Sequence, residues 1–242
     1  MAVLTNAGRA EVAKVLRDLF IADPKTFLIA VANGEDWWGE NQAELKTFDA
    51  DTFSSDLAPL EDPQLSNAAG DTLYVLNTDY TVDSQTGTVT RLATGAIPPG
   101  AQVQFTYKAS TPPAALEQTV LQAEVGRLAP TALDFCLPVA EVLDSDNAVT
   151  VYIGSDLYAI VQRPTRMLLA RAHLLPNDGT GDPIRAYGLF MGCAVDAQLP
   201  PGQQFYEPDQ VTETGVLALA THIAAVPHSG ESGLDLSLVF EI

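Results

Sequence analysis

The chain has few basic residues for its length. Its 242 residues include 12 Lys and Arg against 31 Asp and Glu, which gives a formal net charge of −19. A surface this acidic repels the phosphate backbone of nucleic acids and the headgroups of anionic membranes. The composition therefore argues against a nucleic-acid partner. It also predicts that a protein partner would present basic patches to this chain.

Cysteines and long apolar segments are also scarce. The two cysteines, Cys136 and Cys193, are too few for a disulfide framework, and no Cys-x-x-Cys pair suggests zinc or redox chemistry. We expect both to be buried apolar side chains. No window approaches the roughly 18 apolar residues of a membrane-spanning helix, so we expect no membrane insertion. Because the N-terminal residues lack the pattern of a secretory signal, we expect synthesis in a cytoplasm.

Catalytic signatures are missing as well. The closest approach to a Gly-x-Ser-x-Gly nucleophile elbow, residues 230–233, has the wrong spacing, and Gly179 and Gly181 lack the third glycine of a dinucleotide fingerprint. The histidines lack the one-turn spacing of a metal-binding helix; they are His173, His222 and His228. We therefore expect no enzymatic activity and no cofactor. Carboxylate pairs that hydrolyse a glycan are defined by their distance in space, so a cell-wall hydrolase remains a weaker alternative.

Two acid-rich loops, residues 144–147 and 177–182, offer oxygen ligands of the kind that calcium prefers. Neither loop continues into the spaced ligands and closing glutamate of an EF-hand. Both are also ordinary turn sequences, so we expect no metal in either of them.

The most regular pattern lies in the middle of the chain. Residues 73–76 and 80–82 are rich in β-branched and aromatic residues, and residues 84–87 have the composition of a turn that leads into another strand at 88–92. These segments predict a small antiparallel β unit.

Residues 101–107 close this unit with a strict alternation. Val103, Phe105 and Tyr107 fall on one face of the predicted strand, and polar residues fall on the other face. We therefore expect one face to pack against a core while the other face meets water.

Loops bound the β unit on both sides. Residues 49–69 are polar and have no sustained period, and a Thr-Pro-Pro segment occupies residues 111–113. Such boundaries are typical of an inserted module. We predict a module at residues 70–110 within a discontinuous main body made of residues 1–60 and 114–242.

The main body begins with an amphipathic helix. Thr5 is a good helix cap, apolar residues recur at helical spacing over residues 6–20, and Asp23-Pro24 ends the pattern. Residues 26–32 form a short apolar run that suits a buried strand.

After this first strand the pattern turns to short segments. Residues 114–128 are compatible with a helix or a strand, and further strands are predicted at 149–153, 157–162, 166–174, 184–193, 216–226 and 234–242. The sequence therefore predicts a mainly β (α+β) protein. We expect an antiparallel β-sandwich or open barrel with an N-terminal helix and an inserted small β (Ig-like) module.

Trp37 and Trp38 stand next to each other and are the candidate contact residues of the chain. One interpretation is an exposed aromatic ledge that contacts a partner or a glycan. The other interpretation, which we favour, is that at least one of the two rings fills the local core, because tryptophan is highly buried on average.

Several phrases, taken in order, resemble a family of bacteriophage and prophage tail or baseplate proteins. The phrases cover both flanks of the chain; they are Leu4-Thr5 with Gly8-Arg9, Thr119 with Glu124-Val125-Gly126-Arg127, residues 184–192, residues 199–203, Tyr206-Glu207-Pro208 and the C-terminal strand. The middle of the chain departs from this family, in which the two flanks follow each other almost directly. Residues 79–83, 87–91 and 97–100 are instead similar to small β modules of virion proteins.

The resemblance implies a structural subunit without enzymatic activity. It implies a place in the virion tail, in the baseplate of a contractile tail, with multiple copies of the chain and other tail or baseplate proteins as partners. Synthesis would take place in the host bacterial cytoplasm. The alternative is a glycan- or receptor-binding fibre or adaptor module, in which the β unit and the Trp37-Trp38 pair engage the cell surface.

Overall fold

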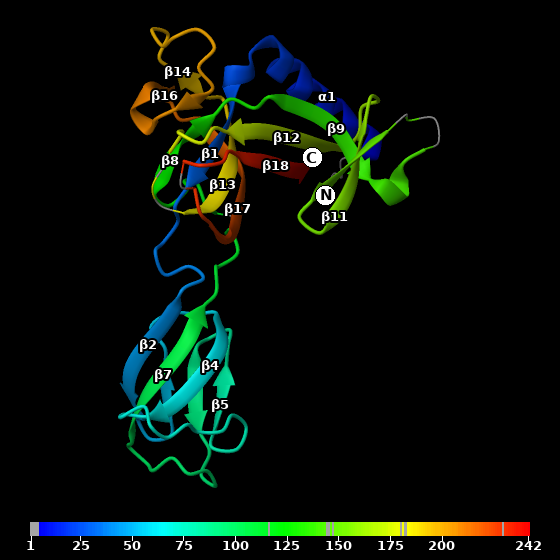
Figure 1. Ribbon diagram of the computed structural model, residues 1–242. Coiled ribbons are helices and arrows are strands. Elements are labelled where there is room, and N and C mark those ends of the chain that lie inside the picture. Colours follow the sequence, from blue (N-terminus) through cyan, green and yellow to red (C-terminus); the bar gives the residue numbers. More distant parts are fainter. Residues whose placement is uncertain are drawn as a thin grey trace. The chain divides into compact units, whose positions relative to one another are not determined.

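The computed structural model describes residues 5–115, 117–143, 146, 148–179, 181, 183–228 and 230–242. Over these residues the protein is mainly β, with one α-helix and five antiparallel sheets (Figure 1). The predicted fold class is thereby confirmed. Among the same residues, no helix is both long and apolar enough to cross a membrane.

The chain divides into two compact units. The first unit contains the residues up to Gly34 together with Ala115–Thr221 and Val226–Ile242. The second unit contains Glu35–Ala114 and the short segment His222–Ala225.

The second unit begins earlier than the predicted inserted module. The sequence predicted residues 1–60 in the main body and the module at residues 70–110. Residues 49–69, expected to be a connection, contain two strands, β3 (Thr52–Ser54) and β4 (Leu60–Asn67). These strands pair with strands of the second unit that lie far along the chain, and local composition does not reveal such pairing.

The first unit opens with the helix α1 (Asn6–Ala22), which confirms the prediction for residues 6–20. The Thr5 hydroxyl oxygen caps the helix by accepting a hydrogen bond from the Gly8 amide at 3.2 Å. Ala13 and Phe20 are buried. The Arg17 side chain connects the helix to a neighbouring strand, because its Nε donates a hydrogen bond to the Leu133 carbonyl at 3.2 Å.

A five-stranded sheet has the fully buried strand β1 (Phe27–Ala32) at its centre. Both edges of β1 are paired, with β8 on one side and β13 on the other. Burial on both faces explains why this strand is uniformly apolar rather than alternating. The other strands, in order around it, are β15 (Phe205–Tyr206), β8 (Glu124–Leu128), β13 (Ile184–Met191) and β17 (Val216–Val226). The end of the ambiguous segment 114–128 is thus a strand.

The second five-stranded sheet of this unit curls into a half-barrel. Its order is β10 (Val149–Ile153), β11 (Asp156–Val161), β9 (Ala132–Pro138), β12 (Met167–Leu174) and β18 (Leu234–Glu241). Val151 of β10 and Val239 of β18 come from opposite ends of this order, yet both pack against the cluster formed by Cys136, Met167 and Leu169. The open-barrel expectation describes this sheet.

Short elements complete the first unit. They are the two-stranded pair β14 (Ala194–Val195) with β16 (Val211–Glu213) and the 3-10 helices η1 (Pro24–Thr26), η2 (Val139–Glu141) and η4 (Pro208–Gln210).

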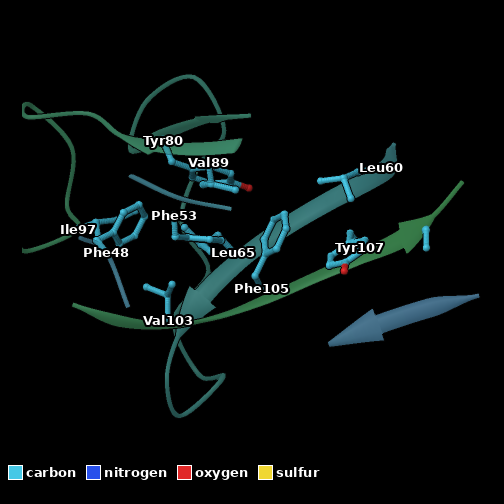
Figure 2. Close-up of a cluster of buried hydrophobic side chains, with 11 residues drawn as sticks. Phe48, Phe53, Leu60, Leu65, Tyr80, Val89, Ile97, Val103, Phe105 and Tyr107 are labelled. Carbon is cyan, nitrogen blue, oxygen red and sulfur yellow. The ribbon is translucent and has the colours of Figure 1, made fainter. Parts of the chain in front are cut away.

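The second unit is a small sandwich of two three-stranded sheets. One sheet has the order β2 (Asn41–Thr47), β7 (Gln102–Ala109), β4, and the other has the order β3, β6 (Thr88–Arg91), β5 (Tyr80–Asp83). Figure 2 shows the apolar side chains of both sheets gathered in one cluster. Val103, Phe105 and Tyr107 of β7 belong to it, so the predicted alternation of this strand is confirmed.

Residues 73–76 were predicted as a strand and form none. They make only isolated bridges, from Leu73 to Ser66 and from Leu76 to Tyr80. A turn follows directly, because the Asp79 carboxylate accepts from the Val75 amide at 2.7 Å and the Asp79 amide donates to the Val75 carbonyl at 2.8 Å. A short polar side chain that bonds nearby backbone groups competes with a strand ladder in this way.

We predict that Phe105→Ala destabilises the second unit by about 3–5 kcal/mol, because Phe105 is fully buried in its core and the change leaves a cavity. Leu45→Ala on β2 is the control: Leu45 is 58% exposed, and the cost should stay within about 0.5 kcal/mol. Urea unfolding followed by tryptophan fluorescence measures this, since both tryptophans lie in the second unit. Equal costs for the two variants would contradict the core assignment.

Candidate functional site

The two tryptophans lie in different environments. Trp38 is only 5% exposed, and its ring centroid lies 4.4 Å from that of His222, a residue of the same unit. The His222 ring is itself oriented by donating from Nδ1 to the Pro112 carbonyl at 2.7 Å. Trp37 is half-buried, packs on the hydrophobic cluster and meets Trp38 edge to face at 6.2 Å. Of the pair, Trp37 is the ring with more surface left for a ligand.

Both cysteines are buried, as the sequence analysis expected. Burial raises the pKa of the Cys136 thiol to about 12 and also raises the pKa of Cys193. A raised pKa keeps a thiol protonated at neutral pH, whereas a nucleophilic cysteine needs a thiolate. Neither thiol is therefore suited to act as a nucleophile, and the Cys193 sulfur instead donates to the Thr214 carbonyl at 3.4 Å and accepts from Arg127 Nη1 at 3.5 Å.

The three histidines make separate contacts. Besides His222, His173 Nδ1 lies 2.6 Å from an Asp235 carboxylate oxygen, and His228 Nε2 lies 2.8 Å from the Asp178 carbonyl. Across the described part of the chain, no group of three or more His, Cys, Asp or Glu side chains could hold a metal ion.

The two acid-rich loops are described only in part. Residues 144, 145, 147, 180 and 182 lie outside the described residues. Asp146 is described, and its carboxylate accepts from Arg163 Nε at 2.8 Å and from Arg163 Nη2 at 3.1 Å. This carboxylate is therefore engaged by an arginine.

Several carboxyl groups have lowered pKa values. Arg166 lowers the pKa of Glu141, Arg163 lowers that of Asp146, and the amides of Val75 and Ala96 lower that of Asp79. Hydrogen bonds from the side chains of Ser110 and Thr86 are the first cause of the lowered pKa of Glu61 and Asp83, respectively. A general acid for glycoside hydrolysis needs the opposite shift, so these groups are suited to ion pairing and to accepting hydrogen bonds.

One hollow in the first unit has a volume of about 510 Å³. It is lined by η1, the segment that follows β8 and residues of the β15 region; the lining includes Asp23, Lys25, Thr131, Gln203 and Tyr206. The Tyr206 hydroxyl donates to the Gln203 carbonyl at 2.7 Å. These described lining residues include no cysteine or histidine that could act as a nucleophile or a base.

The Glu124-Val125-Gly126-Arg127 phrase of β8 forms a buried polar cluster. Arg127 is 4% exposed, and its guanidinium donates to both Glu124 carboxylate oxygens, at 2.7 and 3.1 Å, and to the Thr214 carbonyl at 2.5 Å. The same guanidinium lies 3.8 Å from the centroid of the Phe190 ring. The sequence pattern predicted no role for these residues; the structure shows that Arg127 joins β8 to β13 and to the segment before β17.

Gly126 is required at its position by a close approach. A Cβ at residue 126 would lie 2.8 Å from the Tyr206 carbonyl oxygen and would also collide with the Phe205 ring. The glycine therefore allows β15 to pair with β8.

A family model described as "Baseplate wedge 3 tail fiber network component" matches residues 101–242 of the chain, from the residue before β7 to residue 242. The chain is also similar to the tail sheath protein of Burkholderia phage BcepMu, with 44% identity over 69 residues. That similarity covers 27% of this chain and 14% of the sheath protein, so the chain spans only a small part of the relative's length.

We predict that Glu124→Ala, within the matched region, destabilises the first unit by about 3 kcal/mol, because it leaves the buried Arg127 charge without its carboxylate. Asp18→Ala is the matched control, since it also removes the acid of an ion pair between residues close together in the chain, Lys14–Asp18, but on an exposed surface. Its cost should be much smaller, because solvent screens an exposed ion pair. Thermal unfolding by circular dichroism compares the two variants, and similar losses would contradict a special role for the buried pair.

Proposed function

Because the chain belongs to the family of baseplate wedge 3 tail fiber network components, and is thus a structural component of a phage tail baseplate, we propose that it acts as a non-enzymatic scaffold. The observation that carries the proposal is the family match, which covers residues 101–242 and hence most strands of the first unit. We further propose that the chain assembles in multiple copies within a contractile tail. The similarity to a tail sheath protein supports a tail of the kind that carries a sheath.

The chemistry of the described side chains supports a scaffold. The thiols have raised pKa values, the carboxyl groups with resolved shifts have lowered ones, and the buried Arg127 is bound internally. These groups stabilise the fold rather than face a substrate. A scaffold needs a rigid core and surfaces for its neighbours, and it needs no activated group.

We propose that the partners are other baseplate and tail proteins together with further copies of the chain. The net charge of −19 opposes close stacking of like surfaces, so neighbours with basic patches would fit this chain best. The same charge disfavours nucleic acid, and we propose no membrane insertion. The protein would be made in the host bacterial cytoplasm and would reside in the virion tail.

Immuno-electron microscopy of purified particles tests the location. We expect antibody against this chain to label the baseplate end of the tail, and we expect the chain to sediment with intact particles. Antibody against the sheath serves as a control that labels the tail along its length. If the chain stayed in the supernatant while complete particles pelleted, the scaffold proposal would fail.

A glycan- or receptor-binding module is the second candidate, because Trp37 keeps part of its surface exposed in the second unit. If the chain is a scaffold alone, host-surface glycan should not change its tryptophan fluorescence, and Trp37→Ala should leave adsorption of particles to host cells unchanged. Quenching by glycan that disappears in Trp37→Ala would favour the receptor-binding function. Trp38→Ala is unsuitable as the test, since Trp38 is buried and its loss would disturb the core.

A further inference from the structure

The segment 73–76 of the second unit exposes three apolar side chains within four residues. Leu73 is 70% exposed, Val75 is 58% exposed and Leu76 is 42% exposed. The fourth residue, Tyr74, packs against the hydrophobic cluster and anchors the segment to the core. We call residues 73–76 the apolar loop. An exposed apolar cluster of this kind typically marks an interaction site.

Polar contacts hold the apolar loop from both sides. On its N-terminal side the Asn67 side-chain oxygen accepts from the amides of Asp71 and Thr72, at 3.1 and 3.3 Å. At its base the Tyr74 amide donates to the Leu65 carbonyl at 2.8 Å. The conformation of the loop is therefore built into the second unit.

On its C-terminal side the buried Asp79 is the main constraint. Its two carboxylate oxygens accept from the amides of Val75 and Ala96, each at 2.7 Å. Its carbonyl accepts from the Leu92 amide at 2.8 Å. A loop fixed in this way loses little conformational entropy when it binds, which is the condition for a preorganised contact.

The charges of the second unit restrict what can cover the loop. Residues 35–114 contain 12 Asp and Glu against three Lys and Arg. Each of the three cations is already paired within the unit: Lys46 with Glu44 and Asp56, Arg91 with Asp51, and Lys108 with Glu61. A second copy of the unit would therefore bring one acidic surface against another, whereas a basic surface would be attracted.

The apolar loop lies outside the part of the chain that matches the family model, because the match begins at residue 101. Its partner would therefore bind a part of the chain that the matched region does not include. On the premise of the scaffold function proposed above, we propose that the apolar loop is a preformed docking site for a different subunit of the same tail. That subunit would present an apolar pocket ringed by Lys and Arg side chains.

Photo-crosslinking in assembled particles tests the proposal directly. A benzophenone amino acid replaces Val75 in the full-length chain, and the particles are irradiated and analysed by mass spectrometry. We expect a crosslink to a different tail protein, at a position flanked by Lys or Arg residues. A crosslink to a second copy of this chain would overturn the proposal. If no crosslink forms at residue 75 and the particles adsorb less to host cells, the docking proposal is overturned and the loop is a receptor contact instead.

A matched pair of variants gives an independent measurement. Leu73→Ser combined with Val75→Ser should reduce the amount of the crosslinked partner per particle by about tenfold, because interface energy concentrates in a few apolar anchors. Leu45→Ser is the control, since Leu45 lies in the same unit and has the same 58% exposure as Val75. It should leave the partner at its normal level. Circular dichroism and tryptophan fluorescence verify that both proteins fold.

Asp79→Asn separates the conformation of the loop from its composition. The exposed apolar side chains stay unchanged. In asparagine, only the amide oxygen can still accept a backbone hydrogen bond, because the amide nitrogen that replaces the second carboxylate oxygen is a donor. We expect an intermediate loss of the partner. An unchanged level of the partner would show that preorganisation is not needed and would overturn that part of the proposal.

The number of copies of this chain per particle separates a failure of the scaffold function from a failure of the docking site. If the wild-type chain is absent from particles, the scaffold function fails. If the chain is present while the partner remains bound to every variant, only the docking site fails.

Discussion

The complete burial of β1 is the constraint on which the first unit depends. Every side chain of Phe27–Ala32 is buried, so this strand needs cover on both faces and hydrogen-bonding partners at both edges. β8 and β13 supply the edges. On the far side of β13, Gly188 is needed where β17 approaches, since a Cβ there would lie 2.6 Å from the Leu219 carbonyl oxygen. The position of β8 beside β1 then brings Arg127 into the interior, where Glu124 neutralises its charge.

Polar groups play a different role in the second unit. Its core is the apolar cluster between two small sheets, while the connections between the strands are shaped by side-chain hydrogen bonds. Asp79 and Asn67 hold irregular backbone in place and so allow apolar side chains to remain outside the core. The unit therefore combines a rigid interior with surface features that its own packing does not use. For a protein of a tail assembly, such features are where neighbours would bind.

The two units also differ in what they share with known proteins. The family match covers nearly all strands of the first unit that follow β1, together with β7 of the second unit. Most of the second unit, from β2 to β6, lies before the matched region. The sandwich therefore combines one strand inside the matched region, β7, with five strands that precede it. The net charge of −19 makes a basic surface a more favourable neighbour than an acidic one on electrostatic grounds.

Local patterns in the sequence determined much of this protein. The capped helical period identified α1, the uniform apolar run identified β1, and the alternation of Val103, Phe105 and Tyr107 identified the inner face of β7. Each of these signals depends on residues close together in the chain. The strands within residues 49–69, the ring that covers Trp38 and the carbonyl of Thr214 that binds Arg127 were decided only by the tertiary structure. Strand pairing and the burial of polar groups depend on residues that are brought together from distant parts of the chain, and composition near the site does not encode them.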